Sequence, residues 1–197
     1  MERYISIIQT LPINNRVSKK DEHSFSNLAP RKLIQEQNIK LGNHMQDFFS
    51  KYILTHANGW ASIKEKNKKG EHEMDHVYIN EGRKVVLYFE QKNNIKLDSE
   101  KTKATIKKVK EVTELLKTKY PNYTVQGYIF AARYLHTSED LAQSLIATKY
   151  SDDNVVCVNE FLGLFGLPVL DSYETYKQIV AAVCEKYFGS GEDDDTA

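Results

Sequence analysis

The segment 84–92, KVVLYFEQK, constrains the fold more than any other part of this 197-residue chain. It is rich in β-branched and aromatic residues, which favours a β-strand. A second strand-like segment, 73–80, precedes it across the short turn sequence Asn-Glu-Gly-Arg. Because so short a turn joins neighbouring antiparallel strands, the two segments predict a β-hairpin.

The remaining pattern adds helices and further strands around this hairpin. Pro30 and the apolar spacing that follows it predict a long helix over roughly residues 29–54, with Gly42 as a candidate interruption. The other predicted elements are strands at 60–64, 124–131 and 154–159, and helices at 99–116, 138–147, 160–165 and 172–187. The order α-β-β-β-α-β-α-β-α-α predicts an α/β fold with a mixed β-sheet flanked by helices.

Length and charge predict a single domain over residues 1–190, followed by an acidic disordered tail at 191–197. The formal net charge is zero, with 27 basic and 27 acidic residues, and four of the acids lie in the tail. Without those four the balance is 27 − 23 = +4, so the folded part is modestly basic. This charge permits nucleic-acid binding without requiring it.

No apolar run approaches the ~20 residues of a membrane span, and the N-terminus lacks the pattern of a secretory signal. We therefore expect a cytoplasmic protein with no membrane partner. The two cysteines, Cys157 and Cys184, form no Cys-x-x-Cys motif. They are expected to be buried thiols.

Charged residues gather at one end of the predicted hairpin. Glu90 and Lys92 share a face at the C-terminal end of the second strand, because side chains alternate along a strand. Pairing about a turn centred near residues 81 and 82 places Asp75 opposite residues 87–89, one step short of Glu90, and a bulge or bend would bring the two closer. An Asp and a Glu with a Lys beside them can hold a divalent cation. The hard oxygen ligands that Mg²⁺ prefers are of this kind, and such a metal promotes phosphodiester hydrolysis. The backbone carbonyl of Gln91 is a candidate further ligand.

The spacing of these residues resembles the motif of the PD-(D/E)XK nucleases. Asp75 is followed, after 14 intervening residues, by Glu-Gln-Lys, and Met74 stands in place of the motif's proline. The α-β-β-β-α-β core of that family corresponds to residues 30–131. The resemblance implies a restriction-endonuclease-like core, Mg²⁺ as cofactor, Asp75 and Glu90 as metal ligands and catalytic residues, and Lys92 as the catalytic lysine.

Some members of the family use a glutamate on the first helix as an additional metal ligand, and the resemblance gives this role to Glu36. A solvent-exposed helix glutamate is the alternative. His72 and His76 flank Asp75 and raise the alternative of a zinc site. His76 faces away from Asp75 along the strand, however, and no cysteine cluster accompanies it.

Chain length and the segment YFEQKNNIKLDSEKTKATIKKV resemble type II restriction endonucleases. This implies a homodimer that cuts both strands of double-stranded DNA at a short palindrome, with a cognate methyltransferase in the same system. Two alternatives remain open. One is a structure-specific DNA nuclease of the junction-resolvase or repair type, and the other is a non-catalytic DNA-binding or protein-interaction module on the same core.

The segment that follows the strand at 84–92 contains six candidates for DNA contact, through bases or through phosphates. They are Asn93, Asn94, Lys96, Lys101, Lys103 and Lys107. The helical pattern over 99–116 points Ala104, Leu115 and the other apolar residues to the core. The same pattern places the lysines of this helix, including Lys108 and Lys110, on the side away from the core. A solvated helix face is the alternative for these lysines.

Overall fold

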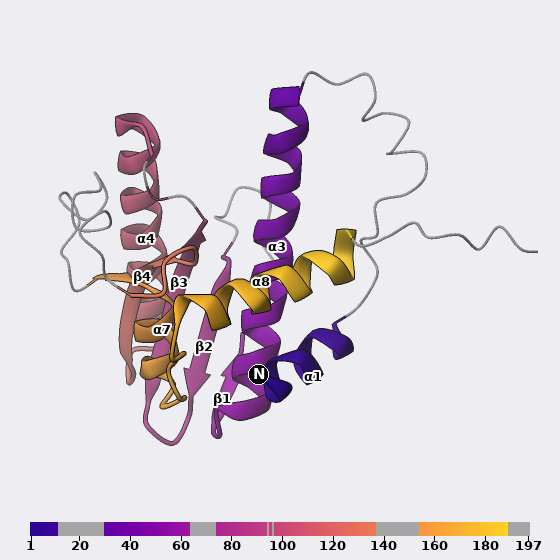
Figure 1. Cartoon of the computed structure of the whole chain (residues 1–197). Coiled ribbons are helices and arrows are strands. Elements are labelled where there is room, and N and C mark those ends of the chain that lie inside the picture. Colours follow the sequence, from indigo (N-terminus) through magenta and orange to yellow (C-terminus); the bar gives the residue numbers. More distant parts are fainter. Residues whose placement is uncertain (12–29, 64–73, 94, 96, 137–153, 189–197) are drawn as a thin grey trace, which may run out of the picture. The chain divides into compact units, whose positions relative to one another are not determined.

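A computed structural model describes residues 1–11, 30–63, 74–93, 95, 97–136 and 154–188 (Figure 1). In the long helix that begins at Pro30, side chains are described from Ile39 onward. The chain divides into two compact units, Met1–Lys51 with Ser172–Ala197, and Tyr52–Asp171. The predicted helix at 138–147 and the predicted tail at 191–197 lie outside the described residues.

The second unit is built on a five-stranded sheet in the order β1-β2-β3-β4-β5. The strands are β1 (Trp60–Ser62), β2 (His76–Asn80), β3 (Val85–Lys92), β4 (Thr124–Ala131) and β5 (Val155–Val156). Strand β2 pairs antiparallel with both β1 and β3, whereas β4 pairs parallel with both β3 and β5. The α/β class and the mixed sheet flanked by helices are thus confirmed. Because β3 is the third of five strands, six of its eight residues are buried.

Helix α4 (Ser99–Lys119) makes the crossover between the parallel strands β3 and β4. Asp98 caps it by accepting a hydrogen bond from the backbone N–H of Lys101 at 2.8 Å. Val109 and Val112 pack against the sheet with Tyr88 and Ile129, among other residues. This helix therefore covers the face of the sheet to which Glu90 and Lys92 also belong.

The approach of α4 to the sheet is close at one point. A Cβ added to Gly127 of β4 would lie 1.9 Å from the hydroxyl oxygen of Thr113 on α4. That distance is far inside van der Waals contact, so this position has room only for glycine.

Helix α7 (Val158–Leu164) packs against the opposite face through aromatic rings. Phe161 stacks on Phe130 of β4 with ring centroids 4.2 Å apart, and it meets Phe89 of β3 edge-on at 4.8 Å. Phe89 and Phe130 alternate with the residues that face α4, so the sheet has a helix on each side.

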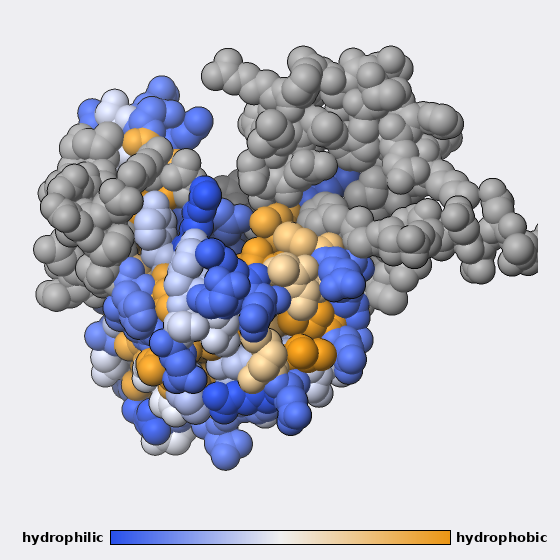
Figure 2. All heavy atoms as spheres, in the orientation of Figure 1, coloured by the Kyte–Doolittle hydropathy of each residue, from blue (hydrophilic) through white to orange (hydrophobic). Residues whose placement is uncertain are grey.

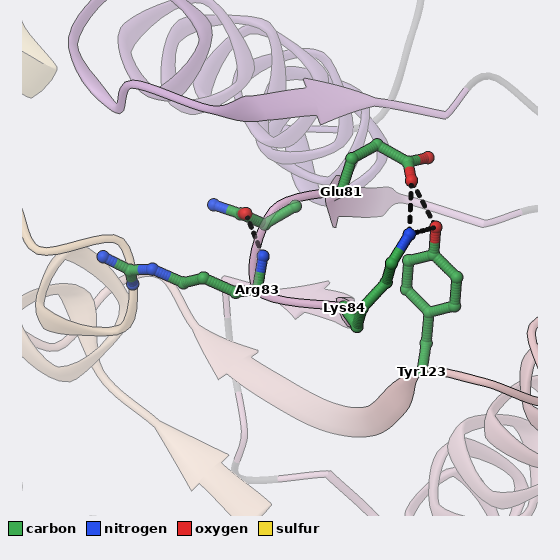
Figure 3. Close-up of polar contacts among 5 residues, drawn as sticks. Glu81, Arg83, Lys84 and Tyr123 are labelled. Atoms are coloured by element: carbon green, nitrogen blue, oxygen red, sulfur yellow. Dashed lines mark hydrogen bonds and ion pairs between the residues drawn. The ribbon is translucent and has the colours of Figure 1, made fainter.

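The turn between β2 and β3 sets the register of the hairpin. It spans residues 81–84, and Lys84 takes the left-handed conformation at φ 53°. Figure 3 shows how the turn is held: Tyr123, just before β4, donates to the Glu81 carboxylate, and the Lys84 ammonium lies 3.2 Å from the Tyr123 hydroxyl and 3.5 Å from Glu81. The backbone N–H of Arg83 donates to the side chain of Asn80 at 2.9 Å.

The first unit contains helices α1 (Glu2–Thr10), α8 (Tyr173–Phe188) and most of α3 (Pro30–His56). Lys186 of α8 donates to the backbone carbonyl of Gln9 in α1 at 2.7 Å. Hydrophobic residues come to the visible surface around these two helices (Figure 2). The sequence pattern did not predict α1, and α3 runs through Gly42 without interruption.

Three of the sequence predictions need correction, those for the segment 154–159, for the buried face of α4 and for Cys184. The segment 154–159 is a strand only at Val155–Val156, because the Glu160 carboxylate accepts a hydrogen bond from the backbone N–H of Cys157 and starts α7 there. The buried face of α4 includes Thr102 and Thr105, whereas Ala104 and Leu115 are exposed. Cys157 is buried, but Cys184 is only partly buried, and both are free thiols.

Within the part of the chain that the structure describes, no helix combines the length and apolar character that crossing a membrane requires.

Candidate active site

Asp75 lies beside Glu90, at the end of the hairpin opposite to the turn. Strands β2 and β3 pair from Asn80↔Val85 to His76↔Phe89, and Asp75 immediately precedes β2. The pairing continued by one residue brings Asp75 opposite Glu90. The predicted register, one step short, was therefore wrong, because the turn keeps four residues unpaired. The Asp75 carboxylate accepts a hydrogen bond from the backbone N–H of Gln91 at 2.8 Å, which fixes it against β3.

The Glu90 carboxylate is held by three side chains. Its Oε1 lies 2.6 Å from the ammonium of Lys92, on the same strand. Its Oε2 lies 2.6 Å from the ammonium of Lys108, on α4, and accepts a hydrogen bond from the Tyr88 hydroxyl at 2.8 Å. The Glu90 side chain is only 4% exposed, so this carboxylate is buried among its partners.

The surroundings move the pKa values of the two carboxyl groups in opposite directions. Burial, followed by the negative charge of Glu90, raises the pKa of Asp75 from 3.8 to about 6. Burial also acts to raise the pKa of Glu90, but the nearby charges and hydrogen bonds of Lys92 and Lys108 outweigh it and leave that pKa lowered. Glu90 is therefore the stable anion of the pair, and Asp75 is the carboxylate that ionises at higher pH.

A buried chain of hydrogen bonds supports the site from the other face of the sheet. His76 Nε2 lies 2.9 Å from the side-chain oxygen of Gln91, and His76 Nδ1 lies 3.1 Å from the Tyr78 hydroxyl. An amide oxygen only accepts, so Nε2 carries the proton and Nδ1 accepts from Tyr78. Burial lowers the pKa of His76 to about 4, which keeps the imidazole neutral. His76 thus positions Gln91, whose backbone N–H holds Asp75.

The other predicted site residues are spread along β3 and α4. Lys101, Lys103 and Lys107 are exposed on α4, where Lys101 pairs with Asp98 at 3.4 Å and Lys107 with Glu111 at 3.7 Å. Asn93 is half-buried at the end of β3. The predicted roles of Asn94, Lys96 and His72, and of the Glu36 side chain, concern groups outside the described part. The Gln91 carbonyl as a metal ligand stays a prediction.

Two residues of the cluster were missed by sequence reasoning. Tyr88 precedes Glu90 by two positions, so the alternation of the strand alone puts it on the same face. Lys108 was assigned to the outer side of its helix and is in fact half-buried against Glu90. Its signal is helical spacing, because it follows the buried Thr105 by three residues and precedes the buried Val112 by four.

The donor set fits a hard divalent cation. Mg²⁺ is commonly bound by one or two carboxylates and completes its shell with water and substrate phosphate. Asp75 and Glu90 supply two such carboxylates at one strand end. Among the residues described, no group of three or more His, Cys, Asp and Glu side chains is arranged for a metal ion. The zinc alternative of the sequence analysis includes His72, which lies outside the described residues, so it stays a prediction.

Comparison with known proteins adds no relative to this picture: no protein-family model matches the chain, and neither does any curated protein or solved structure.

Proposed function

We propose that this protein is a Mg²⁺-dependent endonuclease of the type II restriction class, which hydrolyses phosphodiester bonds in double-stranded DNA. One observation carries the proposal: two carboxylates, Asp75 and Glu90, meet at the ends of neighbouring strands, and the second is bound at 2.6 Å by Lys92. These residue types in this arrangement are those of the motif that the sequence resembles.

In this proposal Asp75 and Glu90 hold the metal ion. Mg²⁺ bound there would neutralise charge on the phosphate and lower the pKa of a bound water molecule. The ammonium of Lys92 is close enough to Glu90 to orient that water and to offset the negative charge that develops on the phosphate in the transition state. Tyr88 and the His76–Gln91 pair keep the two carboxylates in position.

The proposed partner is duplex DNA, with exposed lysines of α4 as phosphate contacts. A homodimer would present one site to each strand, as an isologous interface relates two copies by a twofold axis. The type II assignment also includes a methyltransferase of the same system as its functional companion.

A structure-specific nuclease of the junction-resolvase or repair type would use the same catalytic residues on a branched substrate. A non-catalytic binding module is the third reading. A half-buried cluster of two carboxylates and two lysines disfavours that reading, because such a cluster is costly to maintain without a role.

The test is digestion of phage and plasmid DNA by purified protein, with Mg²⁺ and with EDTA. We expect discrete fragments that require Mg²⁺. Glu90→Gln is expected to lower the cleavage rate by at least about 100-fold, in the range seen when a group that stabilises the transition state is removed. Lys92→Ala is expected to do the same.

Glu114→Gln is the matched control, because it makes the same substitution in an exposed glutamate, which pairs with Lys117 on the surface of α4. It is expected to cut like the wild type. Absence of duplex cleavage by folded wild-type protein would refute the restriction assignment. Cleavage of four-way junctions or flaps would then identify the structure-specific alternative, and binding without cleavage of any substrate would identify the binding module.

A further inference from the structure

Lys108 is the member of the Glu90 cluster for which the proposed mechanism has no task. Its ammonium lies 2.6 Å from Glu90 Oε2, as near as that of Lys92 is to Oε1. The two lysines come from different elements, α4 and β3, and their side chains are 21% and 28% exposed. Both ammonium groups thus combine a buried partner with access to the surface.

Two lysines supply more positive charge than the single negative charge of Glu90 requires. Glu90 also accepts from Tyr88, so its Oε2 already has two donors. With Asp75 ionised, the two carboxylates and the two ammonium groups balance to zero charge. A divalent cation on the same carboxylates adds two positive charges, and the lysines then lie beside a metal ion of their own sign. An incoming phosphodiester, which carries one negative charge, offsets half of this excess and gives the lysines an anionic partner.

The geometry of the two lysines suits such an anion. They approach the two oxygens of one planar anion from separate elements, one ammonium for each oxygen. A phosphodiester presents two non-bridging oxygens of comparable charge, and lysine binds phosphate as a point charge without strict directional demands.

We propose that Lys108 is a second functional lysine of this site, which leaves Glu90 and contacts a non-bridging oxygen of the scissile phosphate when a divalent cation and duplex DNA are bound together. This rests on the proposed nuclease function. Through Lys108, helix α4 would then contact the substrate phosphate within the active site. The contact depends on the metal ion, whereas the exposed lysines of the same helix bind phosphates without one.

The experiment measures the affinity for a DNA duplex as a function of salt concentration, once with Ca²⁺ and once with EDTA. Ca²⁺ takes the same class of oxygen ligands, and a gel run after each titration verifies that the duplex is intact. Each phosphate contact contributes about 0.9 to the slope of log affinity against log salt. In Ca²⁺, Lys108→Gln is expected to lower that slope by about 0.9 and to weaken binding roughly tenfold, as for one charged hydrogen bond.

In EDTA the same variant is expected to match the wild type, because Lys108 then remains on Glu90. Lys117→Gln is the matched control: it lies on the same helix, pairs with Glu114 at 2.8 Å and is 51% exposed. The slope for Lys117→Gln is expected to be the same in Ca²⁺ as in EDTA, whether or not it differs from that of the wild type. Lys108→Arg keeps the charge and is expected to restore the wild-type slope. Lys108→Met, which keeps the unbranched stem, repeats the test if the glutamine variant is unfolded at the assay temperature.

An unchanged slope for Lys108→Gln in Ca²⁺ would overturn the inference, and so would an equal loss in Ca²⁺ and EDTA, which would make Lys108 an ordinary surface contact. Cleavage assays separate this failure from that of the proposed function. If wild-type protein cuts DNA and Glu90→Gln does not, the nuclease assignment stands whatever Lys108 does. If wild-type protein neither cuts nor binds DNA, the nuclease assignment fails and the inference falls with it.

Discussion

Replacing Asp75 by asparagine should stabilise the metal-free protein while it abolishes the proposed activity. The carboxylate is largely removed from water and stands next to Glu90, and both conditions disfavour its charged form. Asparagine has nearly the same shape and retains an oxygen that can accept from the backbone N–H of Gln91. The substitution therefore removes the charge and leaves the hydrogen bond in place.

The size of the effect follows from the pKa. In the unfolded chain Asp75 ionises near its ordinary value of 3.8, and in the folded protein near 6. The folded state thus binds more protons between these values, and its stability falls as the pH rises through them. The interval is worth at most about 3 kcal/mol, at about 1.36 kcal/mol per pH unit. The attraction of Lys92 and Lys108 already lowers this pKa and is contained in its value of about 6, so we expect a gain of up to about 3 kcal/mol at pH 8.

The assay is urea unfolding in EDTA from pH 4 to pH 8, comparing Asp75→Asn with the wild type. The advantage of the variant should be small near pH 4, where Asp75 is protonated in the folded state, and should grow to its full size above pH 6. Asp98→Asn serves as a control of opposite sign. Hydrogen bonds from Lys101, chiefly that of its backbone N–H, lower the pKa of Asp98, so its contribution to stability is present at neutral pH and lost in acid. A variant at position 75 that is less stable than the wild type at pH 8, or whose advantage does not change with pH, would refute this reasoning.

Three further predictions concern packing and pH dependence. Gly127→Ala should destabilise the protein by about 1–3 kcal/mol, because its Cβ would meet the Thr113 hydroxyl at 1.9 Å. Thermal unfolding of the double variant should show that Thr113→Ala offsets part of this loss. If the effects of the two substitutions on stability simply add, the steric explanation is wrong. Asn159→Ala should cost about 2 kcal/mol or more, because the buried Asn159 side chain both donates to and accepts from the backbone of Leu170, at 3.1 and 2.8 Å. Equal stability of the variant and the wild type in urea would argue against this clamp. At Mg²⁺ concentrations below saturation, the initial rate of DNA cleavage should rise with pH through about 6, because Asp75 of the metal-free protein ionises there and can then bind the metal. A rate that stays flat from pH 5 to pH 8 under these conditions would exclude Asp75 as a ligand.

Local sequence pattern was enough to predict several of the helices and strands. The β-branched run of 84–92 predicted β3 to within a residue, and the segment 124–131 matches β4. The cap of α4 is local as well, because Asp98 accepts from the backbone N–H of Lys101, three residues further on. Helix α1 was missed, and its buried residues Tyr4, Ile7 and Ile8 are placed by contacts with α8, which lies more than 160 residues away along the chain. Such contacts leave a weak signal in so short a segment.

The sequence by itself determined that Glu90 and Lys92 share one face of one strand, because alternation is a property of the extended backbone. Whether Asp75 meets them depended on the hairpin register. Only the tertiary structure decided that, through a four-residue turn whose Lys84 is left-handed and whose Glu81 is tied to Tyr123, 42 residues further on. The same holds for Lys108. Its distance from Glu90 is set by how α4 packs over Gly127, and that packing is a sum of many contacts between segments far apart in the sequence.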